Sequence, residues 1–418
     1  MKTYFKWMLL LIVLVTVENT IAQHAKSTLT SQEKTALISM IQEHLKTSYV
    51  DKDIAEQMTA SVGKHLEQKK YKKISDPIAF SKTLTKDLQY ISKDTHLNVR
   101  YEPKRIAQRK RIVSKEQQLK MEQRMAIKMG EINYGFNEVK ILTGNIGYLN
   151  LSMFADTKYA HDTATAAMKF LSNTNAIIID LRNNRGGVPS MIQLLSSYFT
   201  EVTPVLLSNF YERKTASKTQ LYTLSHIDGK RKSNTPLYIL TSKQTFSAAE
   251  AFTYSLKHYK KAIVVGEVTK GGANRTKRFN LNDAFSISIP YIQSTHPITK
   301  GNWEGIGVLP DIQTFEKEAL VKAYIAAIHK TVNRNKNRVF NKIGYDFLQE
   351  KAVANAIIVF KENTRLFPND ANTWDSLGEA YTANKDTDNA LRAYEKALSL
   401  APDSHAVKAM IQKLKSTI

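Results

Sequence analysis

The sequence predicts three successive parts: a small helical domain, an α/β core with a mixed, partly parallel sheet and flanking helices, and an α-helical repeat domain. Three observations indicate this order. Apolar residues recur at helical spacing from Leu29 to about Leu88. Short apolar runs then alternate with helical stretches as far as Tyr291, which is typical of an α/β domain. Finally, a pattern with a period of 34 residues fills the end of the chain.

The first residues have the order of an export signal. Lys2 and Lys6 precede the apolar run 7–17, and the small residue Ala22 ends the segment. We therefore predict a signal peptide over residues 1–22, cleaved after Ala22, and an exported protein that is periplasmic or secreted. An uncleaved anchor is the alternative, although the apolar run is too short to span a bilayer comfortably. No second long apolar run follows, so no stable membrane span is expected after cleavage.

Residues 23–90 are predicted to form the N-terminal helical domain. The apolar residues between positions 37 and 45 fall on one face of a helix, and the same spacing continues downstream. A strand follows, because Leu97 and Val99 alternate with polar residues. His96 therefore lies directly before a strand.

The α/β core is predicted over residues 91–320, and Ser247 stands at a junction within it. The apolar run 236–240 predicts a short buried strand, and a helical pattern starts just after Ser247. A side chain at such a junction can project from the carboxyl edge of a sheet, as a serine nucleophile must. The alternative is that Ser247 only caps the helix, with Glu250 completing a capping box.

Residues 337–418 contain two copies of a repeat. Seven apolar or small positions of the first copy recur 34 residues later: Phe340, Ile343, Gly344, Phe347, Ala356, Phe360 and Pro368 correspond to Trp374, Leu377, Gly378, Tyr381, Ala390, Tyr394 and Pro402. The second copy has the spacing of a tetratricopeptide repeat. Because one helix pair cannot bury its own apolar face, the copies should stack on each other and on the core. The repeats are also a candidate surface for a protein partner.

The composition excludes several kinds of site. The chain has no cysteine, which removes disulfides, thiol catalysis and thiolate metal sites. No residue cluster has metal-site spacing and no glycine loop has a phosphate-binding ending, so neither a metal nor another cofactor is expected. Part of the net charge of +22 lies between Lys104 and Lys128, without a nucleic-acid motif or interleaved aromatic residues. We therefore expect no nucleic-acid partner and interpret this stretch as a solvated helical face, with a docking surface for an acidic partner as the alternative.

Three distant segments carry the groups that nucleophilic catalysis needs. Residues 94–96 offer a histidine base, residues 246–248 offer a serine, and residues 302–308 offer a carboxylate in a glycine-flanked turn. A serine hydroxyl is a weak nucleophile at neutral pH without a neighbouring base, and the base needs an orienting partner.

Together with two glycine-rich segments, these residues resemble the C-terminal processing (tail-specific) serine proteases. The similarity is greatest to the branch that contains the tricorn protease core and the interphotoreceptor retinoid-binding protein modules. The matching blocks are Asp94-x-His96-Leu97, Asp180-Leu181-Arg182-Asn183-Asn184-Arg185-Gly186-Gly187, Thr245-Phe246-Ser247-Ala248-Ala249-Glu250, Gly266-Glu267-x-Thr269-x-Gly271-Gly272-Ala273 and Trp303-Glu304-Gly305-x-Gly307-Val308-x-Pro310-Asp311. The resemblance covers residues 29–312 and implies a crotonase-like core.

The resemblance implies a role for each matching residue. Ser247 would attack the scissile carbonyl, and His96 would take the serine proton and later donate it to the leaving amine. Glu304 would support the histidine through the hydroxyl of Thr95, where the tricorn-type pattern has serine. The implied oxyanion hole consists of the backbone N–H groups of Ala248 and of Gly186 or Gly187.

The chain departs from the family pattern in two ways. Many members use a Ser–Lys dyad, but Gly272 stands at the lysine position and Lys270 lies two residues earlier, so the base is predicted to be His96. No PDZ-like segment lies between His96 and the strand near Ile141. Substrate tails would then be held by the cleft itself, and cations such as Arg275, Lys277 and Arg278 could contribute, although solvated charges are the simpler interpretation.

The expected function is therefore an exported serine peptidase that hydrolyses peptides or unfolded protein C-terminal tails. A non-catalytic carrier of apolar ligands is the first alternative, because retinoid-binding relatives use this fold. A scaffold organised around the repeats is the second alternative.

Overall fold

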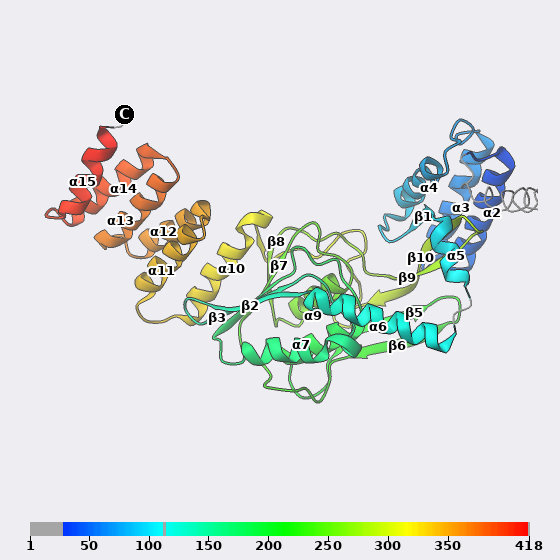
Figure 1. Ribbon diagram of the computed structural model, residues 1–418, viewed down its shortest axis with the longest axis horizontal. Helices are drawn as coiled ribbons and strands as arrows, with labels where there is room; N and C mark the ends of the chain where they lie inside the picture. Colours follow the sequence, from blue (N-terminus) through cyan, green and yellow to red (C-terminus); the bar gives the residue numbers. More distant parts are fainter. Residues whose placement is uncertain (1–27, 112–113, 417–418) are drawn as a thin grey trace, which may run out of the picture. The chain divides into compact units, whose positions relative to one another are not determined.

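The structure, a computed structural model, describes residues 28–111 and 114–416 (Figure 1). The predicted signal peptide lies outside the described residues. The chain divides into two compact units, which we describe one at a time. The first unit comprises the described residues up to Gln118, with Phe210–Thr219 and Asn274–Ser294. The second unit comprises Leu119–Asn209, Gln220–Ala273 and the described residues from Thr295 onward.

The first unit contains the predicted N-terminal helices. They are α2 (Ser31–Ser48), α3 (Lys52–Glu67) and α4 (Pro77–Ser92), and the unit also contains α5 (Pro103–Lys110), which lies beyond the predicted domain. Side-chain caps begin three of them: Thr30 and Glu33 form a capping box on α2, and Asp51 and Asp76 cap α3 and α4. The apolar face predicted between positions 37 and 45 is buried in one core with α3 and α4, which confirms the helical part of the prediction.

A five-stranded sheet completes the first unit, and β10 pairs antiparallel with both β1 and β9 in it. Its strands are β1 (Asn98–Tyr101), β9 (Arg275–Asn280) and β10 (Phe285–Thr295), with β5 (Leu206–Glu212) and β6 (Ser217–Tyr222), of which the first unit contains only Phe210–Thr219. The order is β1-β10-β5-β6, with β9 also paired to β10. Val99 lies opposite Ile287, and both enter the same core as the helices. The turn that carries His96 therefore connects α4 to the edge strand β1, which is paired with β10.

The second unit is built on a six-stranded sheet. Its strands are β2 (Phe136–Leu142), β3 (Ile146–Leu151), β4 (Ala176–Asp180), β7 (Leu237–Thr241), β8 (Ile263–Gly266) and β11 (Ile312–Gln313), in the order β11-β8-β7-β4-β3-β2. Every pairing is parallel except that of β2 with β3. The mixed, partly parallel sheet of the prediction is thus confirmed.

Helices cover both faces of this sheet. The helices are α7 (Thr157–Phe170), α8 (Pro189–Tyr198), α9 (Ala248–His258) and α10 (Glu316–Thr331). Ile177 and Ile179 of β4 pack with α7, α8 and α9, whereas Ile178 packs with α10. Alternate residues of a strand point to opposite faces, so both faces of β4 are buried.

Helix α6 (Lys115–Glu131) and the short 3₁₀ helix η1 (Asn133–Gly135) precede the sheet. No residue of α6 is buried, as predicted for a solvated face. The helix also exposes large apolar side chains, including Leu119, Met121 and Ile127, which are 60%, 60% and 63% exposed. The predicted description as a charged solvated face is therefore incomplete.

The C-terminal repeats are helical and continue the core of the second unit. They comprise α11 (Lys336–Gln349), α12 (Val353–Leu366), α13 (Ala371–Ala383), α14 (Thr387–Leu400) and α15 (His405–Lys415). A Cβ on Gly344 would lie 2.4 Å from the ring of Phe360, and the same close approach recurs between Gly378 and Tyr394 at 2.7 Å. Repeat residues and α10 share one apolar cluster, which confirms stacking on the core. Among the described helices, none combines the length and hydropathy required to cross a bilayer.

Candidate active site

Ser247 lies at a sharp corner between β7 and α9 in the second unit. It is the N-cap residue of α9, with φ 56° and ψ −117°, a backbone conformation that is rare for a residue other than glycine. Such strain costs about 1–3 kcal/mol and persists only where the surroundings enforce it. A strained strand-to-helix corner is the geometry that exposes a serine nucleophile.

Hydrogen bonds to the loop after β4 enforce this corner. The Thr245 hydroxyl donates to the carbonyl of Leu181 at 2.9 Å, and the Ser242 hydroxyl donates to the carbonyl of Arg182 at 2.6 Å. The N–H of Phe246, directly before Ser247, donates to the carbonyl of Asn184 at 3.0 Å. These hydrogen bonds hold the corner against the loop 181–187, the glycine loop, which contains Gly186 and Gly187.

The two predicted glycines lie against this corner in different ways. Gly186 has φ 97°, and a Cβ there would lie 2.8 Å from both the N atom of Ala248 and the Cβ of Ser247. Gly187 has φ 153°, and a Cβ there would lie 1.9 Å from the carbonyl oxygen of Phe154. Any side chain at either position would push the loop away, so glycine is required at both.

The backbone N–H groups of the glycine loop are not equivalent. The N–H of Gly186 donates to the side-chain oxygen of Asn184 at 2.8 Å, so it is already occupied. Within the described part of the chain, the N–H groups of Gly187 and Ala248 donate to no other group. Of the three predicted oxyanion donors, these two are the ones that remain available.

Glu250 connects the corner to a second loop, residues 269–273. Its side chain is fully buried and accepts from the N–H of Ser247 at 2.8 Å, which is the reciprocal bond of the predicted capping box. It also accepts from the hydroxyl of Thr269 at 2.5 Å and from the N–H groups of Gly271 and Gly272 at 2.7 and 2.9 Å. Burial raises the pKa of Glu250, and these four hydrogen bonds oppose that rise.

Glu304 belongs to a turn that packs on the same second loop. Its carboxylate accepts from the N–H of Ala273 at 2.7 Å. The indole N–H of the adjacent Trp303 donates to the carbonyl of Gly272 at 3.0 Å, and the ring of Tyr254, on α9, lies 5.1 Å from that of Trp303. Continuous hydrogen bonding within the second unit therefore links Ser247, through Glu250 and the loop 269–273, to Glu304.

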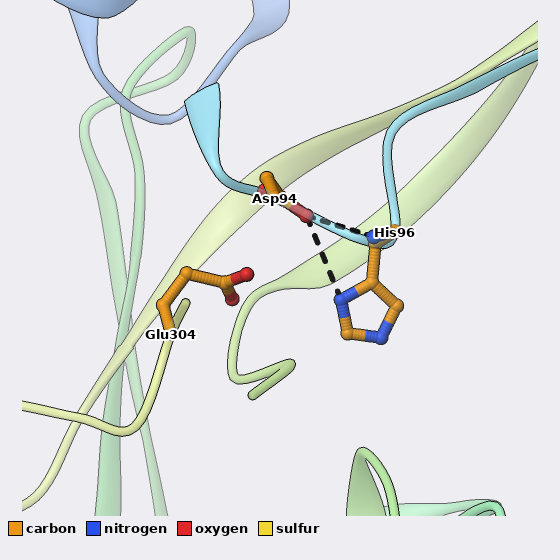
Figure 2. A group of neighbouring side chains, drawn as sticks. All are labelled: Asp94, His96 and Glu304. Carbon is orange, nitrogen blue, oxygen red and sulfur yellow. Dashed lines mark hydrogen bonds and ion pairs between the residues drawn. The ribbon is translucent and has the colours of Figure 1, made fainter. Parts of the chain in front are cut away.

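His96 belongs to the first unit, in the turn between α4 and β1. Asp94 is fully buried and accepts from the N–H of His96 at 2.9 Å, while its Oδ1 lies 3.8 Å from His96 Nδ1 (Figure 2). The hydroxyl of Tyr49 donates to the other Asp94 oxygen at 3.4 Å. Asp94 thus fixes the backbone of His96 and places a negative charge on the Nδ1 side of the ring. Figure 2 also draws Glu304, which belongs to the second unit.

The remaining predicted side chains have simpler surroundings. The Thr95 hydroxyl has no hydrogen-bond partner among the described residues. Lys270 is exposed, and its ammonium lies 4.7 Å from the centre of the Phe246 ring, where a cation–π contact holds it beside the residue that precedes Ser247. Neither unit by itself gathers three metal-ligating side chains within the described ranges. The absence of a metal stays a prediction.

Two residues were not assigned site roles from the sequence. Asp94 was part of a matching block, and its spacing of two residues from His96 was the only signal for a carboxylate beside the ring. Glu250 was interpreted as a helix cap, which is correct but describes only one of its four hydrogen bonds.

Comparison with known proteins finds three family matches along the chain. Residues 145–314 match peptidase family S41, residues 19–131 match the N-terminal domain of peptidase S41 in eukaryotic IRBP, and residues 371–404 match a tetratricopeptide repeat. The chain contains an S41 peptidase domain over residues 145–314. The S41 match contains the corner at Ser247, the glycine loop and Glu304.

The individual relatives of the chain are distant. It is 29% identical over 171 residues to carboxyl-terminal-processing peptidase 2 of Arabidopsis thaliana, covering 40% of this chain and 31% of that protein. It is 27% identical over 169 residues to the carboxy-terminal processing protease CtpB of Bacillus subtilis, covering 40% and 33%. The chain therefore spans about a third of the length of these curated relatives. The solved photosystem II D1 C-terminal processing protease is 16% identical, with a TM-score of 0.43, over 68% of this chain and 94% of that one.

Proposed function

We propose that this protein is an exported serine peptidase that hydrolyses peptides or unfolded C-terminal tails, with Ser247 as the nucleophile. The observation that carries the proposal is the strained corner at Ser247, with a glycine loop packed directly on it. The match of residues 145–314 to peptidase family S41 supports the same chemistry, and relatives named as carboxyl-terminal processing peptidases support the substrate class.

In the proposed reaction, the Ser247 hydroxyl oxygen attacks the carbonyl carbon of the scissile bond and its proton passes to His96. The proton then goes to the leaving amine, and water releases the acyl group from Ser247 by the reverse sequence. Asp94 lies on the Nδ1 side of His96, which leaves Nε2 as the nitrogen for proton transfer. The carboxylate that orients His96 is either Asp94, beside the ring, or Glu304, which would act through the hydroxyl of Thr95.

The developing negative charge on the substrate carbonyl oxygen would be held by the N–H groups of Gly187 and Ala248. Both groups are available, whereas the N–H of Gly186 is bound to Asn184. Losing one such donor typically costs about 3–4 kcal/mol of barrier. Gly186 then has a different function, which is to let the loop approach the corner closely.

Gly186→Ala tests this function of Gly186. The new methyl group would contact the backbone of Ala248 and the side chain of Ser247, so the corner must shift. A shift of about 1 Å in the nucleophile is expected to lower kcat roughly 100-fold, measured on a fluorogenic peptide. Gly301→Ala is the matched control, because a Cβ there meets only the Thr299 carbonyl at 3.9 Å. Equal activity of the two variants would contradict the proposed packing.

Glu250→Gln tests whether the buried carboxylate positions Ser247. An amide in place of the carboxylate turns an NH₂ group toward the N–H donors of Ser247, Gly271 or Gly272, leaving at least one of them unsatisfied. We expect kcat to fall about tenfold or more while KM changes little, with an unfolding free energy lower by about 1–3 kcal/mol. Glu122→Gln, which removes an exposed ion pair with Lys158, should change neither quantity. Wild-type kcat in Glu250→Gln would show that this residue does not position the nucleophile.

Export is part of the proposal and has a direct test. Cleavage after Ala22 would give a mature chain that starts at Gln23. N-terminal sequencing of the protein recovered from outside the cytoplasm distinguishes this chain from one that retains the segment as an anchor.

One observation favours a second function, that of a carrier of apolar ligands. The described residues of the first unit contain a cavity of about 630 Å³, lined largely by apolar side chains such as Leu37, Tyr101, Ile106 and Phe285. Saturable uptake of a fluorescent fatty acid, together with no reaction of Ser247 with a serine-directed phosphonate, would favour the carrier over the peptidase.

A further inference from the structure

The first unit contains four arginines gathered around a single carboxylate. Arg100 belongs to β1, Arg278 to β9, and Arg105 and Arg109 to α5. The carboxylate is that of Glu102, which lies between β1 and α5 and has a side chain that is only 8% exposed. We call these five residues the arginine cluster.

The register of the sheet places Arg100 and Arg278 on the same face. Arg100 lies opposite Ser286 of β10, and Arg278 lies opposite Ser288 on the other edge of that strand. Residues that lie opposite each other share a face, as do residues two apart along one strand. Ile287, between the two serines, points to the other face and is buried in the core with the helices. The two arginines therefore flank the serines on the polar face of the sheet.

One carboxylate does not balance four guanidinium groups. Glu102 Oε1 accepts from Arg109 at 2.7 Å and lies 3.7 Å from Nη1 of Arg278. The other oxygen, Oε2, lies 3.9 Å from Nη1 of Arg105. Within the described part of the chain, every ion pair of the four arginines is made with this one residue. The arginine cluster therefore carries a local charge of +3.

The like charges in the arginine cluster act on one another. Burial lowers the pKa of the Arg278 guanidinium, and the positive charges of Arg100, Arg109 and Arg105 lower it further, against the opposing charge of Glu102. An anion bound among these groups would relieve the repulsion between them.

The guanidinium groups also retain hydrogen-bond donors for such an anion. Arg278 donates to the hydroxyl of Ser286 at 3.1 Å and to the side-chain oxygen of Asn98 at 3.3 Å, which occupies two of its five N–H groups. Arg100 is exposed, and its side chain donates to no group among the described residues. The planar fork of a guanidinium matches the oxygens of a phosphate or carboxylate through parallel hydrogen bonds.

The charge of the cluster favours a phosphate over a carboxylate. A phosphate monoester carries a charge of about −1.5 to −2 at neutral pH and has three strong acceptor oxygens. A carboxylate carries a single charge on two oxygens that lie in one plane. The doubly charged group therefore compensates the local excess more completely, and its oxygens point in enough directions to accept from both strands and from α5.

We propose that the arginine cluster binds a phosphate monoester group, which Arg100 and Arg278 hold by hydrogen bonds while Arg105 and Arg109 add positive charge. The group belongs to a small soluble phosphate or to a lipid headgroup of the same chemistry. This inference does not depend on catalysis by Ser247.

Isothermal titration calorimetry of the full-length protein with inorganic phosphate tests this inference. We expect saturable binding that weakens with salt, and much weaker binding of acetate at the same ionic strength. Arg100→Gln and Arg105→Gln change exposed side chains, so the fold should survive, and each should weaken phosphate binding about tenfold. Acetate that binds as tightly as phosphate would overturn the proposed ligand class.

Glu102→Gln should have the opposite effect. It removes the negative charge of the cluster but keeps a side-chain oxygen as an acceptor, so phosphate should bind several-fold more tightly. The matched controls are Glu122→Gln and Arg392→Gln, which change the same charges at exposed positions on α6 and α14. Both should bind phosphate as the wild type does. Equal changes in controls and cluster variants would show only attraction to the net charge of +22 and would overturn the proposal, as would the absence of saturable binding.

Sedimentation with vesicles distinguishes the two sources of the phosphate group. The vesicles are phosphatidylcholine with and without phosphatidic acid, whose headgroup is a phosphate monoester. A lipid ligand predicts that the wild type sediments only with the vesicles that contain phosphatidic acid and that Arg100→Gln stays in the supernatant. A soluble ligand predicts calorimetric binding of phosphate without sedimentation. Equal sedimentation of the wild type and Arg100→Gln would contradict a lipid ligand held by the arginine cluster.

Discussion

Replacing Ser247 by Ala is expected to abolish peptide hydrolysis, with kcat falling by roughly 10⁵–10⁶-fold. The hydroxyl is the only group at the corner that can form the acyl intermediate in the proposed reaction, so the remaining rate should come from binding and the oxyanion donors alone. Hydrolysis of a fluorogenic peptide measures the loss.

The fold should survive this change. Alanine keeps the Cβ, and the N–H of residue 247 can still donate to Glu250. Thermal unfolding of the variant should therefore stay within a few degrees of the wild type, because the Cβ carries the strain of the φ of 56° in both residues. Full activity in Ser247→Ala would refute the assignment of the nucleophile.

Replacing His96 by Ala is expected to lower kcat by about 10³-fold or more, because the serine loses its proton acceptor. Activity of wild-type protein should rise with pH as the imidazole loses its proton, and this dependence should disappear in His96→Ala. A pH profile therefore separates loss of the base from general damage to the site.

Two further variants decide which acid supports His96. Asp94→Asn can still accept from the N–H of His96 but removes the negative charge beside Nδ1. Glu304→Gln keeps the turn but weakens the bond from the N–H of Ala273. If Asp94 orients the base, Asp94→Asn should cost about 10²–10⁴-fold in kcat and Glu304→Gln much less. The reverse order would support the arrangement through Thr95.

The helical parts were predictable because their signals are local. The capping box at Thr30 and Glu33, the apolar face between positions 37 and 45, and the 34-residue offset each require only nearby residues. The repeat glycines were identified by spacing alone, and the structure gives their physical reason, since Phe360 and Tyr394 leave no room for a Cβ.

The site was predictable only in part, because its decisive contacts join distant segments. The junction at Ser247 follows from a local change of pattern, but three of the four hydrogen bonds to Glu250 come from residues 269–272. Similarly, no sequence pattern shows that Asn184 occupies the N–H of Gly186 and leaves that of Gly187 available. The exposed apolar residues of α6, such as Met121 and Ile127, were also missed, because the stretch was interpreted from its charged residues alone.

The central claim is that Ser247 is a reactive nucleophile activated by His96. The most direct measurement is labelling of the wild-type protein and of His96→Ala with a fluorophosphonate, followed by mass spectrometry of the digested peptides. We predict one label in the wild type, on the peptide that contains Ser247, and labelling at least 100-fold slower in His96→Ala. Labelling of another residue, or an equal rate in both proteins, would contradict the account.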